Sequence, residues 1–343
     1  MRPKHLTDLL KIAIPQKRNV LVVGGPGVGK SDIITDTCKQ LGAKLIISHP
    51  VVSDPTDYKG MPFVVQEGDQ SVAKFLPFSD LKELINAKEL TVFFLDDLGQ
   101  APSSVQAAVM QLLLARRLND HIISENVVFI AATNRRQDKA GVMGILEPVK
   151  SRFCTIVEIE PELDDWVEWA ISHDMPMELI AFVRFRESNN QSVLYNFKPT
   201  LDISNGPCPR TVANVGRWMK DGLPKHLEFE TFKGAAGEVF ATEFLAFLQI
   251  ARSLPDPDDF IQNPRPELIP KEPSTMFALL GAIAHRLTPQ TAPNIIKIAN
   301  MLPPEFSVML VKDCLTKDKK AITRTEAFID WSVKYSNLYK ESF

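Results

Sequence analysis

The chain has 343 residues, 45% hydrophobic and 24% charged, a composition that supports the buried cores of two or three domains. A net charge of −3 gives no general attraction for phosphate backbones, so nucleic acid is not the expected partner. The four cysteines have no CxxC or zinc-ligand spacing, and no apolar run approaches the roughly 18 residues that a membrane helix needs. We therefore expect a soluble, cytoplasmic protein with reduced thiols.

Short β-branched runs alternate with helical patterns from Asn19 to about Glu160, which predicts a parallel five-stranded sheet flanked by helices, an α/β fold. The five predicted strands cover residues 19–23, 44–48, 91–95, 127–132 and 155–159. Gly42 marks the end of a helix after the first strand, and residues 103–118 form a second strong helical pattern. Residues 60–75 fit neither pattern, and we expect a hairpin-like insertion there.

From residue 161 onward the pattern is helical, with Trp166 and Trp169 at a spacing that favours packing in a helical core. Prolines at positions 255, 257, 264, 266, 270 and 273 each lack an amide hydrogen and predict an extended linker. The predicted division is an α/β domain over 1–160, a helical domain over 161–254, a linker over 255–273 and a helical C-terminal region over 274–343.

The segment GGPGVGKS matches the pattern GxxxxGK[ST] between a predicted strand and a predicted helix, the context in which this pattern is meaningful. Such a loop turns its amide hydrogens toward a polyphosphate, and the following helix points its positive end at the same anion. We therefore expect ATP binding, with Lys30 at the β and γ phosphates and the Ser31 hydroxyl on Mg²⁺. The expected nucleotide contacts are Gly24, Gly25, Pro26, Gly27, Val28, Gly29, Lys30 and Ser31.

Polar side chains follow two further strands at the carboxyl edge of the sheet, where ligands of parallel sheets bind. Asp96 is expected to hold Mg²⁺, and Asp97 to polarise the attacking water as a general base. Asn134 follows the next strand and is expected to orient that water. Alone, each pattern would indicate a polar turn. Their order and spacing after the glycine loop favour a catalytic site.

Five motifs occur in one order along the chain: GGPGVGKS, FFLDDLGQAPSSVQAAVMQLLLARRL, AATNRR, LEPVKSRF and CPRTVANVGRWM. In this order they resemble the Walker A, Walker B, sensor 1, arginine-finger and sensor 2 segments of an AAA+ ATPase, and more closely those of the MoxR branch. The resemblance covers about residues 15 to 225. It implies that Arg152 enters the nucleotide site of a neighbouring subunit. It also implies that Arg210, with Arg217 as the alternative, reaches the γ-phosphate from a lid formed by residues 161–254.

The resemblance further implies an ATP-hydrolysing ring, expected to be a hexamer, that acts in a chaperone-like way to remodel or activate a protein partner. A protein with a von Willebrand factor A domain is the partner type that it suggests. Two residues depart from the family pattern: Asp97 replaces the usual glutamate, and Cys208 replaces a serine before the sensor 2 Pro-Arg. Asp97 keeps open a nucleotide-gated assembly protein with little hydrolysis, and the helical tail keeps open a DNA-directed protein similar to clamp loaders.

Two smaller features have alternative interpretations. Tyr58, Lys59 and Met61 follow the second strand and are candidates for contact with a client chain, while a packed turn is at least equally expected. Arg116 and Arg117 are expected to close a helix, where cations favour the negative end, with a role across the subunit interface as the alternative.

Overall fold

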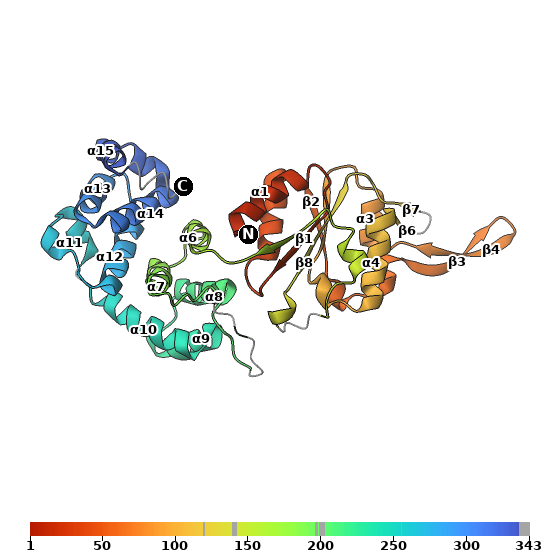
Figure 1. Cartoon of the computed structure of the whole chain (residues 1–343), viewed down its shortest axis with the longest axis horizontal. Coiled ribbons are helices and arrows are strands. Elements are labelled where there is room, and N and C mark those ends of the chain that lie inside the picture. The colour runs from red at the N-terminus through yellow and green to blue at the C-terminus, as the bar shows by residue number, and fades with distance from the viewer. Residues whose placement is uncertain (119–120, 139–142, 196–197, 199–202, 255, 336–343) are drawn as a thin grey trace. The chain divides into compact units, whose positions relative to one another are not determined.

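The computed structural model describes residues 1–118, 121–138, 143–195, 198, 203–254 and 256–335. The chain divides into two compact units, Met1–Pro161 and Glu162–Phe343 (Figure 1). None of the helices within those ranges is both long and apolar enough to cross a membrane.

The first unit is built on a parallel five-stranded sheet with the strand order β2-β5-β8-β1-β9. Its strands are β1 (Val20–Gly24), β2 (Lys44–Ser48), β5 (Thr91–Leu95), β8 (Val127–Thr133) and β9 (Thr155–Ile159). The predicted sheet is confirmed, with strand ends that differ by at most one residue. The central strands β5 and β8 are buried along their whole length, which explains their nearly continuous apolar sequence.

Helices cover both faces of this sheet (Figure 1). They are α1 (Pro3–Ala13), α2 (Lys30–Leu41), α3 (Ser79–Ile85) and α4 (Ser103–Ala115). Because successive strand residues point to opposite faces, Val22 of β1 packs with α1 and α2, whereas Leu21 packs with α3 and α4. Helix α2 ends where predicted, at Gly42, whose φ of 64° is left-handed.

The expected hairpin-like insertion is confirmed: β3 (Met61–Glu67) and β4 (Gln70–Leu76) pair antiparallel and form a separate two-stranded sheet. The unit also contains four 3-10 helices, η1 (Pro50–Val52), η2 (Pro55–Tyr58), η3 (Leu98–Gln100) and η4 (Arg136–Asp138), and the short helix α5 (Glu147–Lys150) among its described residues.

The predicted helix over 103–118 is wrong at its end. Arg116 has a left-handed φ of 46°, and the chain continues into β6 (Arg117–Leu118), which pairs with β7 (His121–Ile122). The Arg116 guanidinium donates 2.8 and 2.9 Å hydrogen bonds to the carbonyls of Ser124 and Val127. Burial lowers the pKa of this guanidinium. Arg116 therefore ties α4 to the start of β8 within its own unit, and the helix stops short to allow it.

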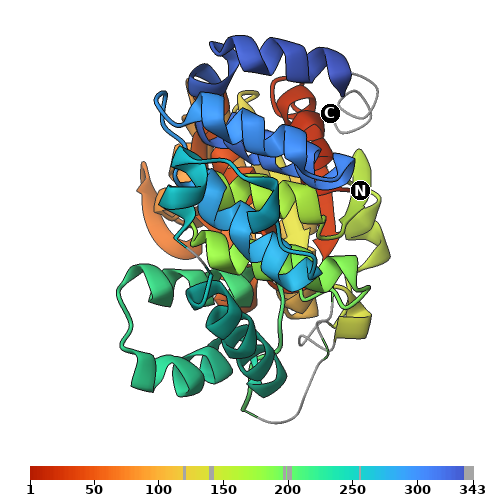
Figure 2. The same cartoon turned by 90° about the vertical axis from the view of Figure 1, so that its left-hand side faces the viewer.

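Every element of regular secondary structure among the described residues of the second unit is a helix (Figure 2). The α-helices are α6 (Leu163–Ser172), α7 (Met177–Ser188), α8 (Pro209–Lys220), α9 (Lys225–Ala236), α10 (Glu238–Arg252), α11 (Pro257–Gln262), α12 (Pro273–His285), α13 (Ala292–Met301), α14 (Pro304–Thr323) and α15 (Glu326–Lys334). The 3-10 helix η5 spans Pro266–Leu268.

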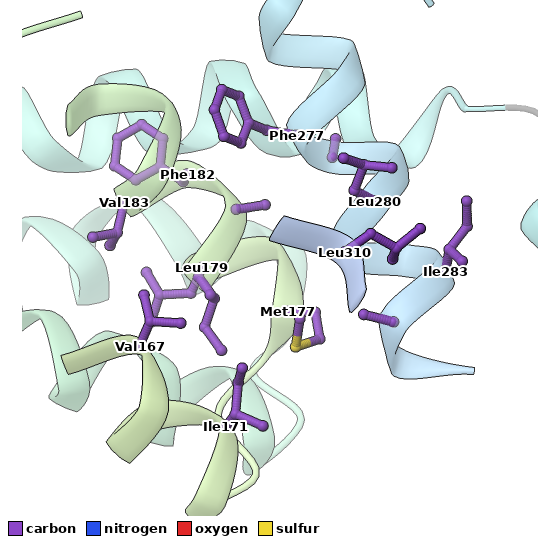
Figure 3. Packing of buried hydrophobic residues seen from close by; sticks show 14 of the residues in the cluster. Val167, Ile171, Met177, Leu179, Phe182, Val183, Phe277, Leu280, Ile283 and Leu310 are labelled. Carbon is purple, nitrogen blue, oxygen red and sulfur yellow. The ribbon is translucent and has the colours of Figure 1, made fainter. Parts of the chain in front are cut away.

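One hydrophobic core runs through all of these α-helices, from Trp166 in α6 to Trp331 in α15. Figure 3 shows side chains of this core that point toward one another: Val167, Ile171, Met177, Leu179, Phe182, Val183, Phe277, Leu280, Ile283 and Leu310. Trp166 is buried as expected, while Trp169 is partly buried and stacks on His173. The division of this unit into lid, linker and C-terminal region stays a prediction.

The extended backbone predicted for residues 255–273 is wrong. That segment contains α11 and η5, and Phe260 and Ile261 are buried in the core of the unit. Three prolines begin helices instead of interrupting them: Pro257, Pro266 and Pro273. At the first helical position the missing amide hydrogen costs nothing, because that group has no partner within the helix.

Candidate nucleotide-binding site

The glycine loop joins the carboxyl end of β1 to the start of α2, and its backbone requires glycine at several positions. Gly27 and Gly29 have left-handed φ angles of 73° and 91°. A Cβ on Gly24 would lie 2.9 Å from Cγ1 and 3.0 Å from the carbonyl oxygen of Ile159 in β9. The loop therefore has a closely packed conformation that glycine alone adopts without strain, directly before a helix of 12 residues, a helix start that attracts anions.

Lys30 is the first residue of α2, and its side chain is 7% exposed. Its ammonium donates hydrogen bonds of 2.9 Å to the carbonyls of Gly24 and Gly25 and of 2.8 Å to Oδ1 of Asn134. A cation is thus fixed inside the loop, where burial strengthens its attraction for an anion. The structure brings together Lys30 and Asn134, which the sequence placed at the same sheet edge.

Ser31 and Asp96 also meet. The Ser31 hydroxyl donates a 2.8 Å hydrogen bond to Oδ2 of Asp96, directly after β5. The second carboxylate oxygen of Asp96 accepts a hydrogen bond from the amide of Asp97 at 3.1 Å. The hydroxyl and the carboxylate lie 2.8 Å apart, close to the separation of two adjacent oxygen ligands of Mg²⁺.

Asp97 adopts a left-handed backbone conformation with φ of 55°, which aspartate tolerates better than most residues. Its Oδ1 accepts a 3.2 Å hydrogen bond from Nδ2 of Asn134. Asn134 therefore links the ammonium of Lys30 to the carboxylate of Asp97. This side chain is 9% exposed, so the link is largely shielded from solvent.

Arg135 is a residue of this site that sequence reasoning missed. Its guanidinium forms two hydrogen bonds with Asp138, of 3.0 and 3.1 Å, and reaches Glu158 at 3.4 Å. These acids raise the pKa of Arg135. A Cβ on Gly25 would lie 3.3 Å from Nη2 of Arg135, so this ion pair packs directly against the loop. The sequence feature that could have identified this ion pair is an arginine and an aspartate three residues apart, just after the end of strand β8.

Arg152 lies elsewhere in the unit. It follows α5 and precedes β9, and the nearby amide of Cys154 donates to the carbonyl of Asn19 at 2.8 Å. Because β1 and β9 are parallel and paired from Val20–Thr155 to Gly24–Ile159, Arg152 is at the amino edge of the sheet and the loop at the carboxyl edge. Nη1 of Arg152 donates to Ser151 at 2.7 Å, and its buried Nε has no hydrogen-bond partner among the described residues.

Arg210 belongs to the second unit, where it is exposed in the first turn of α8 after Pro209. The amide of Cys208 donates a 2.8 Å hydrogen bond to Oγ1 of Thr211, which closes the start of this helix despite the missing serine. Arg217 is exposed too and donates to Asn214. The assignment of either arginine to the nucleotide stays a prediction.

The prediction that Tyr58 contacts a client chain is wrong, because its side chain is 2% exposed. It packs in the core between the sheet and α4, as the alternative of a packed turn expected. Lys59 is half-buried, whereas Met61 is 42% exposed at the start of the hairpin.

Residues 20–160 match the family described as ATPase family associated with various cellular activities (AAA). These residues are similar to an AAA domain, and we refer to them by that name. The sheet and the P-loop of this domain agree with the AAA+ fold predicted from the motifs. The matched family is AAA as a whole, so the match does not assign the chain to the MoxR branch.

No curated protein compared with the chain matches it. Among solved structures, a RuvB variant from Thermotoga maritima is 14% identical, with a TM-score of 0.43 over 97% of this chain and 88% of that chain. A second RuvB structure, titled Holliday junction branch migration motor, is 12% identical, with a TM-score of 0.41 over 97% of this chain and 86% of that chain. These likenesses are too distant to bear on the function of this chain.

The residues of the AAA domain fit a magnesium nucleotide. No cluster of three or more His, Cys, Asp or Glu side chains that could hold a metal ion occurs in the described part of the chain. Magnesium in nucleotide sites needs only one or two protein oxygens, because phosphate and water complete its shell. The paired oxygens of Ser31 and Asp96 satisfy that requirement next to the glycine loop.

Proposed function

We propose that the AAA domain binds ATP with Mg²⁺ and hydrolyses it to ADP and phosphate. One observation carries this proposal: hydrogen bonds of 2.8 to 3.2 Å gather five side chains at the carboxyl edge of one sheet, directly against a glycine loop. These side chains are Lys30, Ser31, Asp96, Asp97 and Asn134. A cation, a metal-ligating oxygen pair, a base and a neutral amide are the groups that phosphoryl transfer to water needs.

Each side chain then has a separate task. Mg²⁺, when bound, neutralises charge on the phosphate oxygens. Lys30 and the loop amides hold the β and γ phosphates, while Ser31 and Asp96 provide the metal ligands. Asp97 accepts a hydrogen bond from the water that attacks the γ-phosphorus, as the bond from that phosphorus to the bridging oxygen of ADP breaks. Asn134 fixes the direction of the Asp97 carboxylate through its 3.2 Å hydrogen bond.

Arg152 completes the site of another copy of the chain. It lies at the amino edge of its own sheet, and the five-residue strand β1 alone separates the two edges by about 15 Å. A guanidinium so placed cannot reach its own glycine loop. Delivered by a neighbour, it would neutralise charge that develops on the γ-phosphoryl oxygens, an effect of about three to five powers of ten in rate. A closed ring provides every subunit with such a neighbour, and we propose a hexamer.

The more specific function that we propose is a chaperone-like ATPase of the MoxR type, which remodels or activates a protein partner. A protein with a von Willebrand factor A domain is the candidate partner. The order of the five motifs supports this function, as does the β3–β4 hairpin after β2. In this assignment Arg210 reports the γ-phosphate to the helical lid.

Mixing two inactive variants tests the shared site. Lys30→Ala removes the phosphate contact and Arg152→Ala removes the donated guanidinium, so each variant alone should hydrolyse ATP at no more than about 1% of the wild-type rate. In a mixture, some interfaces combine an intact loop with an intact arginine, and activity should return to a substantial fraction of wild type. A mixture as inactive as its components would contradict hydrolysis between subunits.

The short side chain of Asp97 favours one second candidate, a nucleotide-gated assembly protein that hydrolyses ATP slowly. Its carboxylate is one methylene shorter than the usual glutamate, and displacements near 1 Å can cost a hundredfold in rate. The Asp97→Glu variant separates the two candidates. Wild-type turnover that equals or exceeds that of Asp97→Glu supports the ATPase, whereas a large gain in the variant supports slow hydrolysis as the natural state.

A further inference from the structure

Tyr58 places a polar group in an apolar core. The ring packs with residues of β5 and α4 and is 2% exposed. Its hydroxyl lies 2.6 Å from the hydroxyl of Ser48 and donates to that of Ser53 at 3.3 Å. Burial raises the pKa of this phenol, so it stays a neutral hydrogen-bonding group. A phenylalanine would fill the same space without a hydroxyl to desolvate. We therefore ask what the two hydrogen bonds of this hydroxyl hold in place.

Ser48 connects this hydroxyl to the nucleotide site. It is the last residue of β2, and its carbonyl accepts a 2.9 Å hydrogen bond from the amide of Asp96. Ser48 thus contacts Tyr58 through its side chain and Asp96 through its backbone. Asp96 in turn accepts the hydrogen bond from Ser31. Three consecutive contacts therefore lead from the Tyr58 ring to the oxygen pair that fits Mg²⁺.

Tyr58 is also fixed to the base of the β3–β4 hairpin. It ends η2, whose first turn is closed by reciprocal hydrogen bonds between Asp54 and Asp57. Two residues later Gly60 has a left-handed φ of 81°, and a Cβ there would lie 2.5 Å from the carbonyl oxygen of Leu76. Both ends of the hairpin therefore meet immediately after Tyr58, so closely that position 60 has no room for a side chain.

The hairpin itself exposes apolar side chains. Phe63 is 51% exposed, Val64 73% and Phe75 43%. A two-stranded sheet with so little burial is marginally stable by itself, so its orientation depends on how its base is held. Tyr58 is a buried residue two positions before Gly60 at that base.

We propose that Tyr58 is a positioning residue that ties the base of the β3–β4 hairpin to the magnesium carboxylate Asp96. The inference rests on the proposed ATP site and adds a coupling between that site and the β3–β4 hairpin. A magnesium nucleotide fixes Asp96, Asp96 fixes Ser48, and Ser48 fixes Tyr58 and the hairpin. By linkage, whatever displaces the hairpin also changes the affinity for the magnesium nucleotide.

Nucleotide binding with and without magnesium tests the first half of this chain of contacts. Affinity for ADP without Mg²⁺ depends on the glycine loop, whereas the gain in affinity on adding Mg²⁺ depends on Ser31 and Asp96. Tyr58→Phe should leave the magnesium-free affinity unchanged and reduce the gain by roughly 2- to 10-fold, the effect of one buried hydrogen bond. Ser48→Ala should do the same, and the double variant should lose no more than either single variant.

A matched control makes the same chemical change elsewhere. Tyr335→Phe alters another buried tyrosine, in the second unit, and should leave the magnesium gain at its wild-type value. Thermal unfolding of each variant separates a loss of positioning from a loss of fold. A merely structural role of Tyr58 would lower the unfolding temperature and change both affinities together.

Cleavage by chymotrypsin tests the second half. Phe63 and Phe75 are exposed cleavage sites on the hairpin, and mass spectrometry identifies their fragments among others. In the wild-type chain, MgADP should change the cleavage rate at these two sites by at least about 3-fold, and in Tyr58→Phe that response should disappear.

The proposal requires both results. It is overturned if Tyr58→Phe keeps the full magnesium gain, or if its hairpin still responds to MgADP as the wild type does. A wild-type chain that binds MgADP with no change at the hairpin overturns it too and leaves the proposed function intact. A wild-type chain that binds no nucleotide contradicts the proposed function itself.

Discussion

The ammonium of Lys30 and the amide of Asn134, 104 residues apart, are joined by a 2.8 Å hydrogen bond at the carboxyl edge of the sheet. The same amide donates from its nitrogen to Asp97. One neutral side chain thus sets the distance between the cation that we propose to hold the phosphates and the carboxylate that we propose to face the attacking water. Hydrolysis should depend on this side chain more than nucleotide binding does.

Replacing Asn134 with alanine should therefore lower kcat by about 100-fold and change KM for ATP by only a few-fold, because Lys30 keeps its loop contacts while Asp97 loses its orientation. Steady-state ATPase measurements provide both constants. Asn126→Ala is the matched control, since Asn126 directly precedes the amino end of the same strand β8 and its side chain donates to the carbonyl of Ala87 at 3.2 Å. Equal losses in the two variants would show that Asn134 matters for the fold alone.

The Asp97→Asn variant should bind ATP within about 3-fold of wild type and hydrolyse it at least 100-fold more slowly, because an amide cannot take up the proton of the attacking water. Calorimetry measures the binding and phosphate release measures the rate. Asp36→Asn makes the same change at an exposed position on α2 and should alter neither quantity. Hydrolysis at the wild-type rate in Asp97→Asn would remove the base from the proposed mechanism.

In the second unit, Arg184 of α7 and Asp313 of α14 form a buried ion pair. Arg184→Leu leaves the aspartate buried without its partner and should destabilise this unit by about 3–5 kcal/mol. All four tryptophans lie in the second unit, so their fluorescence during urea unfolding reports on that unit alone.

The control for this prediction is Arg265→Ala, which removes an exposed ion pair with Asp259 and should cost at most about 1 kcal/mol. Leucine at both 184 and 313 should restore much of the stability that Arg184→Leu loses, because no charge then remains buried. A single variant as stable as the wild type would show that the pair is dispensable.

The buried thiol of Cys38 predicts that the stability of the first unit depends on pH. Burial raises the pKa of its thiol from 9.0 to about 11, so the folded state favours the protonated form. The stability from this group is complete below pH 9.0 and is lost as the pH rises toward 11, because the unfolded chain ionises first.

Urea unfolding at pH 8 and at pH 10.5 measures this loss of stability. Reaction with a thiol reagent at pH 8 checks the burial that causes it: exposed Cys154 should react quickly and Cys38 only on unfolding. The fast phase should vanish in Cys154→Ser. Labelling of Cys38 in the folded protein at the rate of Cys154 would contradict the burial.

The sheet could be predicted from sequence because its strands are short apolar runs with β-branched residues between clear helical patterns, as in β5 and β8. The site followed from the same argument. In a parallel sheet, residues that end neighbouring strands must meet at one edge, so Lys30, Asp96 and Asn134 converge whatever the loops between them do.

What could not be predicted depends on contacts distant in sequence. The sequence around Arg116 does not show that its guanidinium binds two carbonyls that follow the β6–β7 pair. The predicted end of α4 was therefore misplaced. The proline-rich segment has the composition of a linker, and only the burial of Phe260 and Ile261 shows that it belongs to the core. Arg135 was missed because its role depends on a loop more than 100 residues earlier in the chain, against which it packs.

The central claim is that the glycine loop and Lys30 grip the phosphates of ATP with Mg²⁺ next to Ser31 and Asp96. Titration calorimetry of the folded, full-length chain with MgADP and MgATP tests it most directly. We expect saturable binding of one nucleotide per chain in the wild type, and at least a 100-fold loss of affinity in Lys30→Ala. No heat of binding at millimolar nucleotide, or equal affinity in the wild type and in Lys30→Ala, would contradict it.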